Sequence, residues 1–385
     1  MSGAEIAQTR LRESSLDLIR GGAALLVCAN HLRAVSVENF QDVLNTSILQ
    51  KLFYLMTSLG HQSVIVFFVL SGYFVGGSLL ARGVAFSWRE YGSARLIRLW
   101  AVLVPALVLT LAIDLHVTSV APGVLSGEYA TTWNMGPQPG GDYSLGVGAF
   151  VGNLLFLQEI FLPVFGSNDP LWSLAFEFWY YMLFPLLLIG FGGVLGSHRI
   201  GTRGLALLVA GLILIVLPDT ARVGFLCWLG GAMVFVLKRS KRRIWVPVWL
   251  GYMIFAGGTV VSRWLGKAEY APAQVDLVMG GATIFLLVAV ANKAQPSLLD
   301  TLLSRGAYHL SEMSYSLYLI HFPLVLLIGG TFFGNGRLVP NPYGLAIYFC
   351  WLGLLLVVAW GFWYLFERHT LEIRRVVQQF LVRTQ

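Results

Sequence analysis

Long apolar runs recur from one end of the chain to the other. A helix needs about 20 mostly apolar residues to cross the hydrocarbon core of a bilayer. Runs of about that length predict about ten transmembrane helices, of which the fifth is the shortest. They cover residues 16–35, 61–80, 95–117, 171–190, 205–219, 222–238, 245–262, 272–291, 312–333 and 343–366. The pattern indicates an all-α integral membrane protein.

One more apolar run, at 147–165, contains Asn153, Gln158, Glu159 and Pro163. These polar and helix-breaking residues favour a re-entrant or interfacial segment over a full span. The charge pattern favours the same interpretation. If this run crossed the membrane, the basic cluster at 238–243 would lie on the outer side, against the positive-inside rule.

Basic residues gather in alternate links between the apolar runs. They occur around 82–98, 199–203, 238–243 and 368–383, and none lies between Arg98 and Arg199. Because cytoplasmic loops carry the excess of Lys and Arg, we expect a multi-pass protein of the inner or plasma membrane with both termini in the cytoplasm. Arg263, Lys267 and Arg337 are exceptions on the outer side.

Composition narrows the class of protein further. Of the 385 residues, 57% are hydrophobic and 12% charged, about half the charge of a soluble domain. We therefore expect one membrane-embedded domain over residues 1–385, with no fused soluble domain. The net charge of +7 is explained by topology, and nucleic-acid binding is not expected. Cys28, Cys227 and Cys350 lack metal-like spacing, so they are interpreted as small buried hydrophobes and no metal site is expected.

The first predicted span carries Arg20 and His31. Eleven residues correspond to three helical turns plus about 20°, so both side chains share one face about 16.5 Å apart along the axis. Ionisable groups within a membrane are candidates for functional sites. The alternatives are an arginine that snorkels to the surface and a hydrogen-bonded packing histidine. The shared face favours a stripe that lines a polar cavity.

Four later residues, Arg95, Arg98, Glu177 and His321, also carry ionisable groups within predicted spans. Arg95 and Arg98 lie one turn apart and either bind phosphates, which match the guanidinium fork, or anchor the helix at the cytoplasmic surface. Glu177 lies among aromatic residues, where it is either a functional carboxylate or part of a structural hydrogen bond or ion pair. His321 is either a second site histidine or a packing group. Ser71 and Gly72 occupy a position typical of close helix packing.

Five segments, in order, resemble the signatures of the acyltransferase-3 family of membrane O-acyltransferases. They are the Arg20–His31 spacing in the first span, Val-Phe-Phe-Val-Leu-Ser-Gly-Tyr at 66–73, the Arg95–Arg98 pair, Leu-Trp-Ser-Leu-Ala-Phe-Glu at 171–177 and Ser-Tyr-Ser-Leu-Tyr-Leu-Ile-His at 314–321. The chain departs from the family at 367–369, where Glu-Arg-His stands in place of Glu-Arg-Pro.

The resemblance implies transfer of an acyl group, usually acetyl, from cytoplasmic acyl-CoA to a hydroxyl of a carbohydrate or of a glycosylated or lipid-linked acceptor. In that scheme we expect His31 to be the general base. Arg95 and Arg98, with Arg20, would hold the phosphates of coenzyme A. Glu177 would orient His31 or bind acceptor hydroxyls.

Two other functional classes compete with this hypothesis. A non-catalytic transporter or flippase for a glycan or lipid would also carry intramembrane charges, but no inverted repeat is visible. A membrane scaffold would not explain charges on one helix face. The outer loop at 118–146, with Tyr129, Trp133 and Tyr143, is either an acceptor platform or an aromatic belt at the membrane interface.

Overall fold

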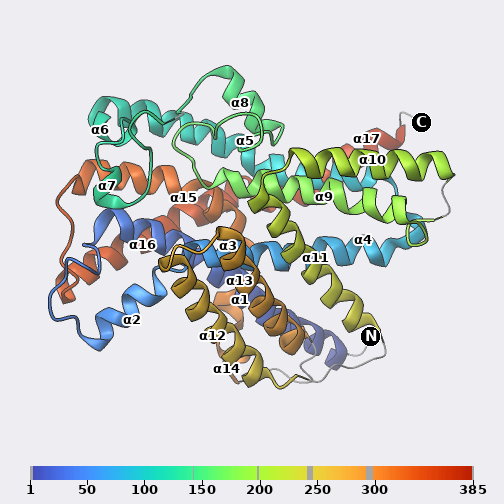
Figure 1. Cartoon of the computed structure of the whole chain (residues 1–385), viewed down its shortest axis with the longest axis horizontal. Coiled ribbons are helices and arrows are strands. Elements are labelled where there is room, and N and C mark those ends of the chain that lie inside the picture. The colour runs from blue at the N-terminus through green and yellow to red at the C-terminus, as the bar shows by residue number, and fades with distance from the viewer. Residues whose placement is uncertain (1–2, 142, 197–198, 241–245, 292–297, 384–385) are drawn as a thin grey trace. The chain divides into compact units, whose positions relative to one another are not determined.

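The computed structural model describes residues 3–141, 143–196, 199–240, 246–291 and 298–383. Figure 1 shows that these residues form a succession of helices. The described part of the chain has isolated β-bridges but no strand, which confirms the all-α prediction. Residues 241–245 lie outside the described residues, so the structure describes only part of the basic cluster at 238–243.

Seven helical segments are long and apolar enough to cross a membrane, among the described residues. They coincide with seven of the predicted spans. They are α3–η2 (Gly60–Ala85), α5 (Trp88–Val120), α9 (Leu171–Phe191), α11 (Asp219–Arg239), α13 (Pro272–Ala291), α15–η3 (Ser314–Phe333), and the segment Pro342–Gln379, which includes α16 (Pro342–Leu365), η4 (Glu367–His369) and most of α17 (Thr370–Arg383).

The other three predicted spans are also helical but do not meet that standard. They lie on α1 (Gly3–Ser36), α10 (Ile200–Val216) and α12 (Val248–Lys267). The 17 residues of α10 are fewer than the about 20 that a span needs. Charged residues interrupt the other two, Asp17 and Arg20 in α1 and Arg263 in α12. The structure therefore supports seven spans, and the predicted count of about ten is not confirmed.

The apolar run at 147–165 is mostly not helical. Its helix, α8, covers only Val147–Leu154, and eight residues rise about 12 Å against a hydrocarbon core of about 30 Å. The chain then turns back through a loop in which Phe156 and Glu159 adopt positive φ angles of 58° and 61°. This segment is too short to cross the membrane, as predicted. Whether it is re-entrant or interfacial stays a prediction.

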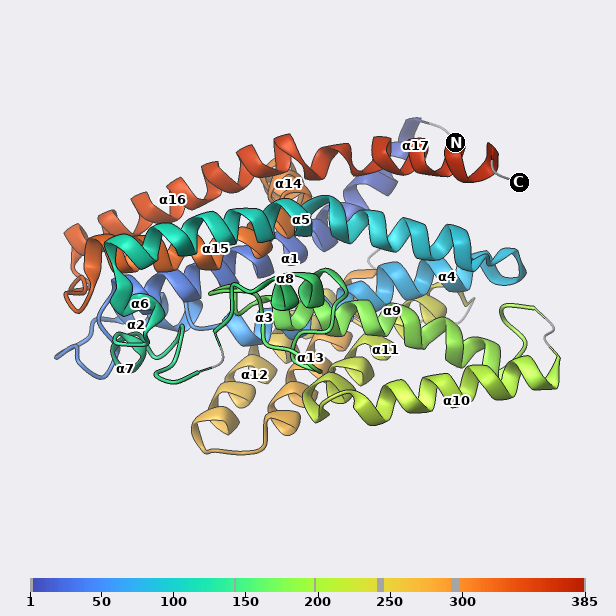
Figure 2. The ribbon, with the colours of Figure 1, turned by 90° about the horizontal axis from the view of Figure 1, so that it is seen from above.

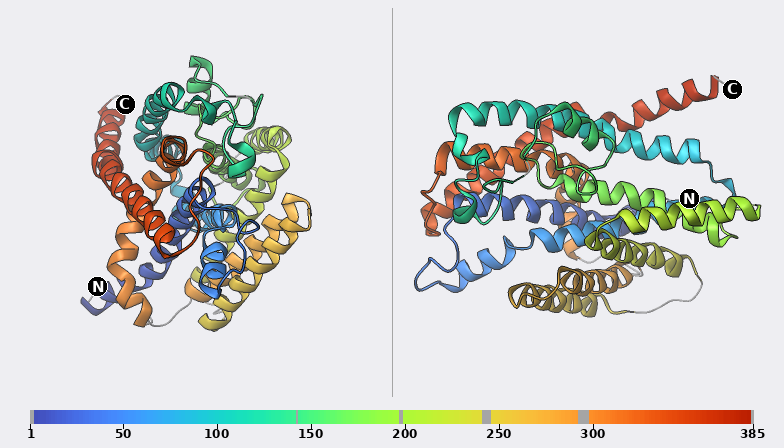
Figure 3. Two further views of the ribbon diagram at one scale, coloured as in Figure 1. Left: turned by 90° about the vertical axis from the view of Figure 1, so that its left-hand side faces the viewer. Right: turned by 45° about the horizontal axis from the view of Figure 1, so that its top comes forward.

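The chain folds into two compact units. The first consists of Met1–Ala23, His61–Tyr91 and Phe176–Ser311, and the second of Ala24–Gly60, Gly92–Ala175 and Glu312–Gln385. In the first unit, α12 and α13 lie side by side, as Figures 1 and 3 show. The helix α11 packs against the π-helix η1 (Gly72–Gly76).

Small residues allow this close packing in the first unit. A side chain at Gly72 would collide with the backbone of Trp228, and one at Gly231 would collide with the backbone of Val69. The two helices therefore touch backbone to backbone, which glycine alone permits. This confirms the predicted close-packing role of Gly72.

The second unit is built around α15 (Ser314–Ile328). Figure 2 shows α15 and α16 side by side. The Asn341 side chain caps α16 by accepting from the N–H of Gly344 at 2.8 Å, and Pro342 occupies the first turn. The Tyr348 hydroxyl of α16 donates to the carbonyl of Ala29 on α1 at 2.9 Å. These contacts hold the part of α1 that carries His31 next to α16.

Large apolar side chains are exposed on several of the candidate spans. Val108, Leu226 and Val357 are all more than half exposed, as expected of helices whose outer faces contact lipid. All three cysteines are free, and Cys28 and Cys227 are buried as predicted. Cys350 is exposed on α16, so that part of the prediction was wrong. An apolar position on a membrane helix can face lipid as well as the protein interior.

Candidate active site

The predicted base, His31, is paired with a second histidine in the second unit. Nδ1 of His31 lies 2.8 Å from Nε2 of His321 on α15. The two rings are nearly parallel, with centroids 5.1 Å apart and an interplanar angle of 3°. Phe322 packs edge-on against the His31 ring. His321 is therefore in direct contact with the candidate base, and its role as a site histidine stays a prediction.

The hydrogen bonds of His321 define the tautomers of the neutral pair. Its Nδ1 lies 2.7 Å from the carbonyl oxygen of Tyr318 and 3.1 Å from that of Leu317. Because a carbonyl only accepts, Nδ1 of His321 carries the hydrogen and its Nε2 carries a lone pair. Nδ1 of His31 must then donate to that lone pair. This leaves Nε2 of His31 unprotonated, without a hydrogen-bond partner among the described residues.

The turn of α15 before His321 is held by the start of α9. The Tyr318 hydroxyl lies 2.6 Å from Oγ of Ser173 and 3.2 Å from the carbonyl oxygen of Pro170. His321 itself is 1% exposed, and the buried ring of Phe322 follows it. The His321 ring is thus fixed by packing and by hydrogen bonds.

Arg95 and Arg98 lie one turn apart on α5, in the same unit as the histidine pair. Arg98 donates from Nη2 to Oε1 of Glu367 at 2.7 Å, and its guanidinium lies 5.0 Å from the centre of the Tyr315 ring. The Arg98 side chain is 38% exposed. Both arginines remain candidates for phosphate binding.

The partner of Arg98 was missed in the sequence, where Glu367 appeared only as part of a family signature. Glu367 is 5% exposed. Its Oε2 accepts from the backbone N–H of Ser316 at 2.9 Å and from its hydroxyl at 2.6 Å. This carboxylate therefore joins α5, η4 and the first turn of α15. In the sequence, only the family signature at 367–369 pointed to Glu367.

Glu177 and Arg20 belong to the first unit, so the structure does not group them with His31. Oε1 of Glu177 accepts from the Tyr181 hydroxyl at 2.5 Å. With Tyr181 donating there, Ser71 must donate to Tyr181 at 3.3 Å, while Trp228 Nε1 donates to Ser71 at 3.1 Å. This series of hydrogen bonds leads from Trp228 through Ser71 and Tyr181 to Glu177. It places no base directly beside Ser71, as expected for a structural serine.

Arg20 takes part in a small polar cluster of the first unit. Its Nε donates to Oγ of Ser311 at 2.6 Å, and that hydroxyl donates to Asp17 at 2.8 Å. Nη2 of Arg20 also lies 3.6 Å from Asp17. Arg20 and His31 both lie on the single helix α1, as the spacing predicted. The proposed role of Arg20 toward coenzyme A stays a prediction.

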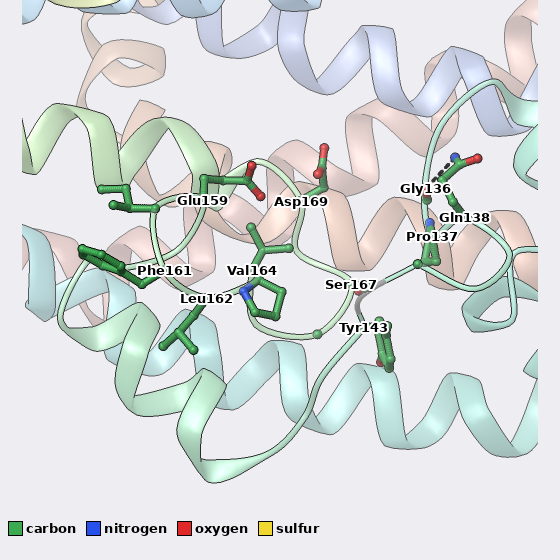
Figure 4. Close-up of a pocket in the computed structure, with 14 residues that line it drawn as sticks. Gly136, Pro137, Gln138, Tyr143, Glu159, Phe161, Leu162, Val164, Ser167 and Asp169 are labelled. Atoms are coloured by element: carbon green, nitrogen blue, oxygen red, sulfur yellow. Dashed lines mark hydrogen bonds between the residues drawn. The ribbon is translucent and has the colours of Figure 1, made fainter. Parts of the chain in front are cut away.

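The loops between α5 and α9 line an open pocket of about 480 Å³ in the second unit. Figure 4 shows Glu159 and Asp169 extending to the same side of the loop that forms one wall, with Tyr143 and Gln138 on other parts of the lining. Two strong hydrogen bonds anchor this wall to α5. Asp114 accepts from the N–H and the hydroxyl of Ser167 at 2.7 and 2.6 Å.

The aromatic residues of the loop at 118–146 have different environments. Trp133 is 1% exposed, stacks on Tyr129 and donates from Nε1 to the carbonyl of Gly334 at 3.0 Å. It is a packing residue and offers no free ring face to a ligand. Tyr143 lines the cavity. The choice between an acceptor platform and an aromatic belt for this loop stays a prediction.

Comparison with known proteins points to one reaction type. The family model described as "Acyltransferase domain", the acyltransferase-3 model, matches residues 13–366. The curated protein "Acyltransferase MdmB" from Streptomyces mycarofaciens is 26% identical over 353 residues, which cover 82% of this chain and 79% of that protein. No solved structure matches this chain.

Proposed function

Because the chain belongs to the acyltransferase-3 family, we propose that it moves an acyl group, acetyl in the simplest case, from acyl-CoA to a hydroxyl of a glycan or of a glycosylated or lipid-linked acceptor. The donor enters from the cytoplasm, where both termini lie, and the acceptor enters from the other side of the inner or plasma membrane. The relative from Streptomyces mycarofaciens is named for acyl transfer and its name specifies no acceptor.

The observation that carries the proposal is the hydrogen bond between His31 and His321. It leaves Nε2 of His31 with the lone pair that a general base requires. Nε2 takes the proton of the acceptor hydroxyl while the hydroxyl oxygen attacks the thioester carbonyl. The tetrahedral oxyanion then collapses, the C–S bond breaks, and the imidazolium of His31 returns the proton to the thiolate. The products are an ester and free coenzyme A.

His321 stabilises the charged form of His31 during this cycle. When Nε2 of His31 is protonated, its Nδ1–H becomes a stronger donor to the lone pair of His321. The carbonyls of Leu317 and Tyr318 hold the opposite edge of the His321 ring. His321 therefore acts through His31 and is a positioning residue.

The arginines bind the acyl-CoA donor. Arg95 and Arg98 hold the phosphates of coenzyme A, and the Glu367 carboxylate orients the Arg98 guanidinium. The roles suggested by the sequence for Arg20 toward coenzyme A and for Glu177 toward the acceptor stay proposals, because both residues belong to the first unit. No metal is needed, because the base, the thioester and the arginines supply the required groups.

Free-thiol release tests this function and separates it from the alternative. The protein in lipid nanodiscs is mixed with acetyl-CoA, then with succinyl-CoA, in the presence or absence of octyl glycosides as acceptor probes. Acceptor-dependent release of thiol, together with an acylated glycoside detected by mass spectrometry, is expected. A non-catalytic transporter or flippase would release no thiol with either donor.

A further inference from the structure

The turn of α15 that carries His321 lacks the backbone hydrogen bond that normally closes a helical turn. In an α-helix, the carbonyl of Leu319 would accept from the N–H of the residue four positions later. That residue is Pro323, which has no N–H and whose ring crowds the same carbonyl. His321 lies midway between these two residues. Because a buried carbonyl requires a donor, Leu319 needs one from outside the helix.

Asn168 supplies this donor. It is a fully buried residue just before α9, and its Nδ2 donates to the carbonyl oxygen of Leu319 at 2.9 Å. The second hydrogen of Nδ2 goes to Oγ1 of Thr110 at 3.1 Å. Because the Thr110 hydroxyl gives its own hydrogen to the carbonyl of Ala106 at 2.9 Å, its oxygen accepts from Asn168. The two acceptors therefore define the orientation of the amide, with Nδ2 directed at α15.

The backbone around Asn168 is anchored to α5. The preceding residue, Ser167, donates from its N–H and its hydroxyl to the buried carboxylate of Asp114 at 2.7 and 2.6 Å. Thr110 and Asp114 lie one turn apart on α5, so one face of that helix holds two consecutive residues of the loop. The carbonyl of Asn168 also accepts from the N–H of Leu171 at 3.1 Å. The backbone and the side chain of Asn168 are thus both fixed where it contacts α15.

A second proline, in the first unit, has a similar donor. Pro185 lies inside α9 and has no N–H for the carbonyl of Tyr181, four residues earlier. The hydroxyl of the buried Tyr91 donates to that carbonyl at 3.1 Å. Side chains often replace the backbone donor that a proline removes from a membrane helix. What distinguishes Pro323 is the residue in the open turn, which is the histidine that contacts His31.

We propose that Asn168 is a positioning residue for the transfer reaction, because its Nδ2 replaces the N–H that Pro323 lacks. It holds the open turn so that Nε2 of His321 stays within hydrogen-bonding distance of Nδ1 of His31. This inference rests on the proposed acyl transfer with His31 as the base. Helices kink at proline, so loss of the donor lets α15 rotate there and carry the His321 ring with it. A displacement of about 1 Å near reacting groups can slow a reaction about 100-fold.

The test is a double-mutant cycle between Asn168→Ala and Pro323→Ala. Pro323→Ala restores a backbone N–H at this position, so the Leu319 carbonyl no longer depends on Asn168. In the otherwise native protein, Asn168→Ala should lower kcat for thiol release about tenfold, with KM for acyl-CoA unchanged. In the Pro323→Ala background, the same substitution should lower kcat by less than about twofold. Equal losses of kcat in the two backgrounds would overturn the proposal.

The pH profile distinguishes positioning from a general loss of stability. Asn168→Ala should move the acidic limb of the kcat profile, as His321→Ala does. Gln158→Met is the matched control, because it removes another fully buried amide, whose Nε2 donates to the carbonyl of Leu171 at 2.9 Å. It should lower the thermal unfolding temperature and leave the pH profile in place. A limb that moves in neither variant, or equally in both, would overturn the proposal.

Thr110→Val provides a second test if Asn168→Ala fails to fold. Valine has nearly the shape of threonine but no hydroxyl, so the Asn168 amide loses one of its two acceptors and keeps the other. The acidic limb should then move in the same direction as in His321→Ala, by a smaller amount. An unmoved limb in folded Thr110→Val would contradict the role of Asn168.

A readout without catalysis separates this inference from the proposed function. NMR spectra of protein with isotope-labelled histidine nitrogens report the hydrogen bond at Nε2 of His321, and His321→Gln assigns the signal. Asn168→Ala should shift this signal, and adding Pro323→Ala should restore it. This pattern without any thiol release by the native protein would support Asn168 and remove the enzymatic proposal. Native thiol release with a signal that Asn168→Ala leaves unmoved would keep the acyl transfer and overturn the role of Asn168.

Discussion

Nδ1 of His31 lies 2.8 Å from Nε2 of His321, and the two backbone carbonyls behind His321 decide the direction of this hydrogen bond. The relationship resembles a base with an orienting partner, in which the partner is a neutral histidine and not a carboxylate. It gives His31 one available lone pair and one fixed ring orientation.

Replacing His321 should slow catalysis through His31. In His321→Ala, Nδ1 of His31 loses its acceptor and the ring loses its preferred tautomer, so kcat should fall about 100-fold with little change in KM for the donor. His321→Gln offers an amide oxygen to His31 and should recover part of the rate. The measurement is thiol release as a function of pH.

The pH profile distinguishes orientation from a general loss of structure. Loss of an acceptor for the His31 imidazolium should move the acidic limb of the kcat profile in His321→Ala, with partial return in His321→Gln. Equal losses in both variants with an unmoved profile would contradict an orienting role.

Removing Arg98 should have two separable effects. Arg98→Ala leaves Glu367 buried without its cation, which should lower stability by about 1–2 kcal/mol because the arginine is partly exposed. It should also raise KM for acyl-CoA. The double variant Arg98→Ala/Glu367→Gln should regain stability, measured by thermal unfolding, but keep the raised KM. If KM returns with stability, Arg98 serves only the fold.

Arg95 offers a cleaner test of donor binding. Arg95→Ala should raise KM for acyl-CoA about tenfold, the value of a phosphate contact of about 1.4 kcal/mol, with kcat nearly unchanged. Arg305→Ala serves as the charge-matched control, because Arg305 is a basic residue on α14 (Leu298–Glu312) in the first unit. Identical donor dependence in Arg95→Ala and the native protein would make Arg95 a topological anchor.

Hydropathy predicted the spans that are apolar throughout, because lipid contact requires long uninterrupted runs. It was less decisive for α1, α10 and α12, where charged residues or short length weaken the pattern. The failure of 147–165 to form a spanning helix was also predictable, since Asn153 and Pro163 mark places where backbone and side chains bond locally. Asn153 accepts from the N–H of Phe165 and donates to the carbonyl of Pro163.

The site was only partly predictable. His31, Arg95 and Arg98 followed from charge within spans, yet the pairing of His31 with His321 joins residues 290 positions apart and no local pattern encodes it. Glu367 was missed for the same reason, because tertiary contacts to Arg98 and Ser316 give it its role. Glu177 and Arg20 lie in the first unit, where their proposed roles stay predictions.

The most direct test of the account is acceptor-dependent thiol release by His31→Ala, purified in nanodiscs alongside the native protein. We predict that kcat falls by about 10²–10⁴, while the gel-filtration profile, thermal unfolding and binding of acyl-CoA stay native. Transfer at the native rate by a folded His31→Ala protein would contradict the assignment of His31 as the base.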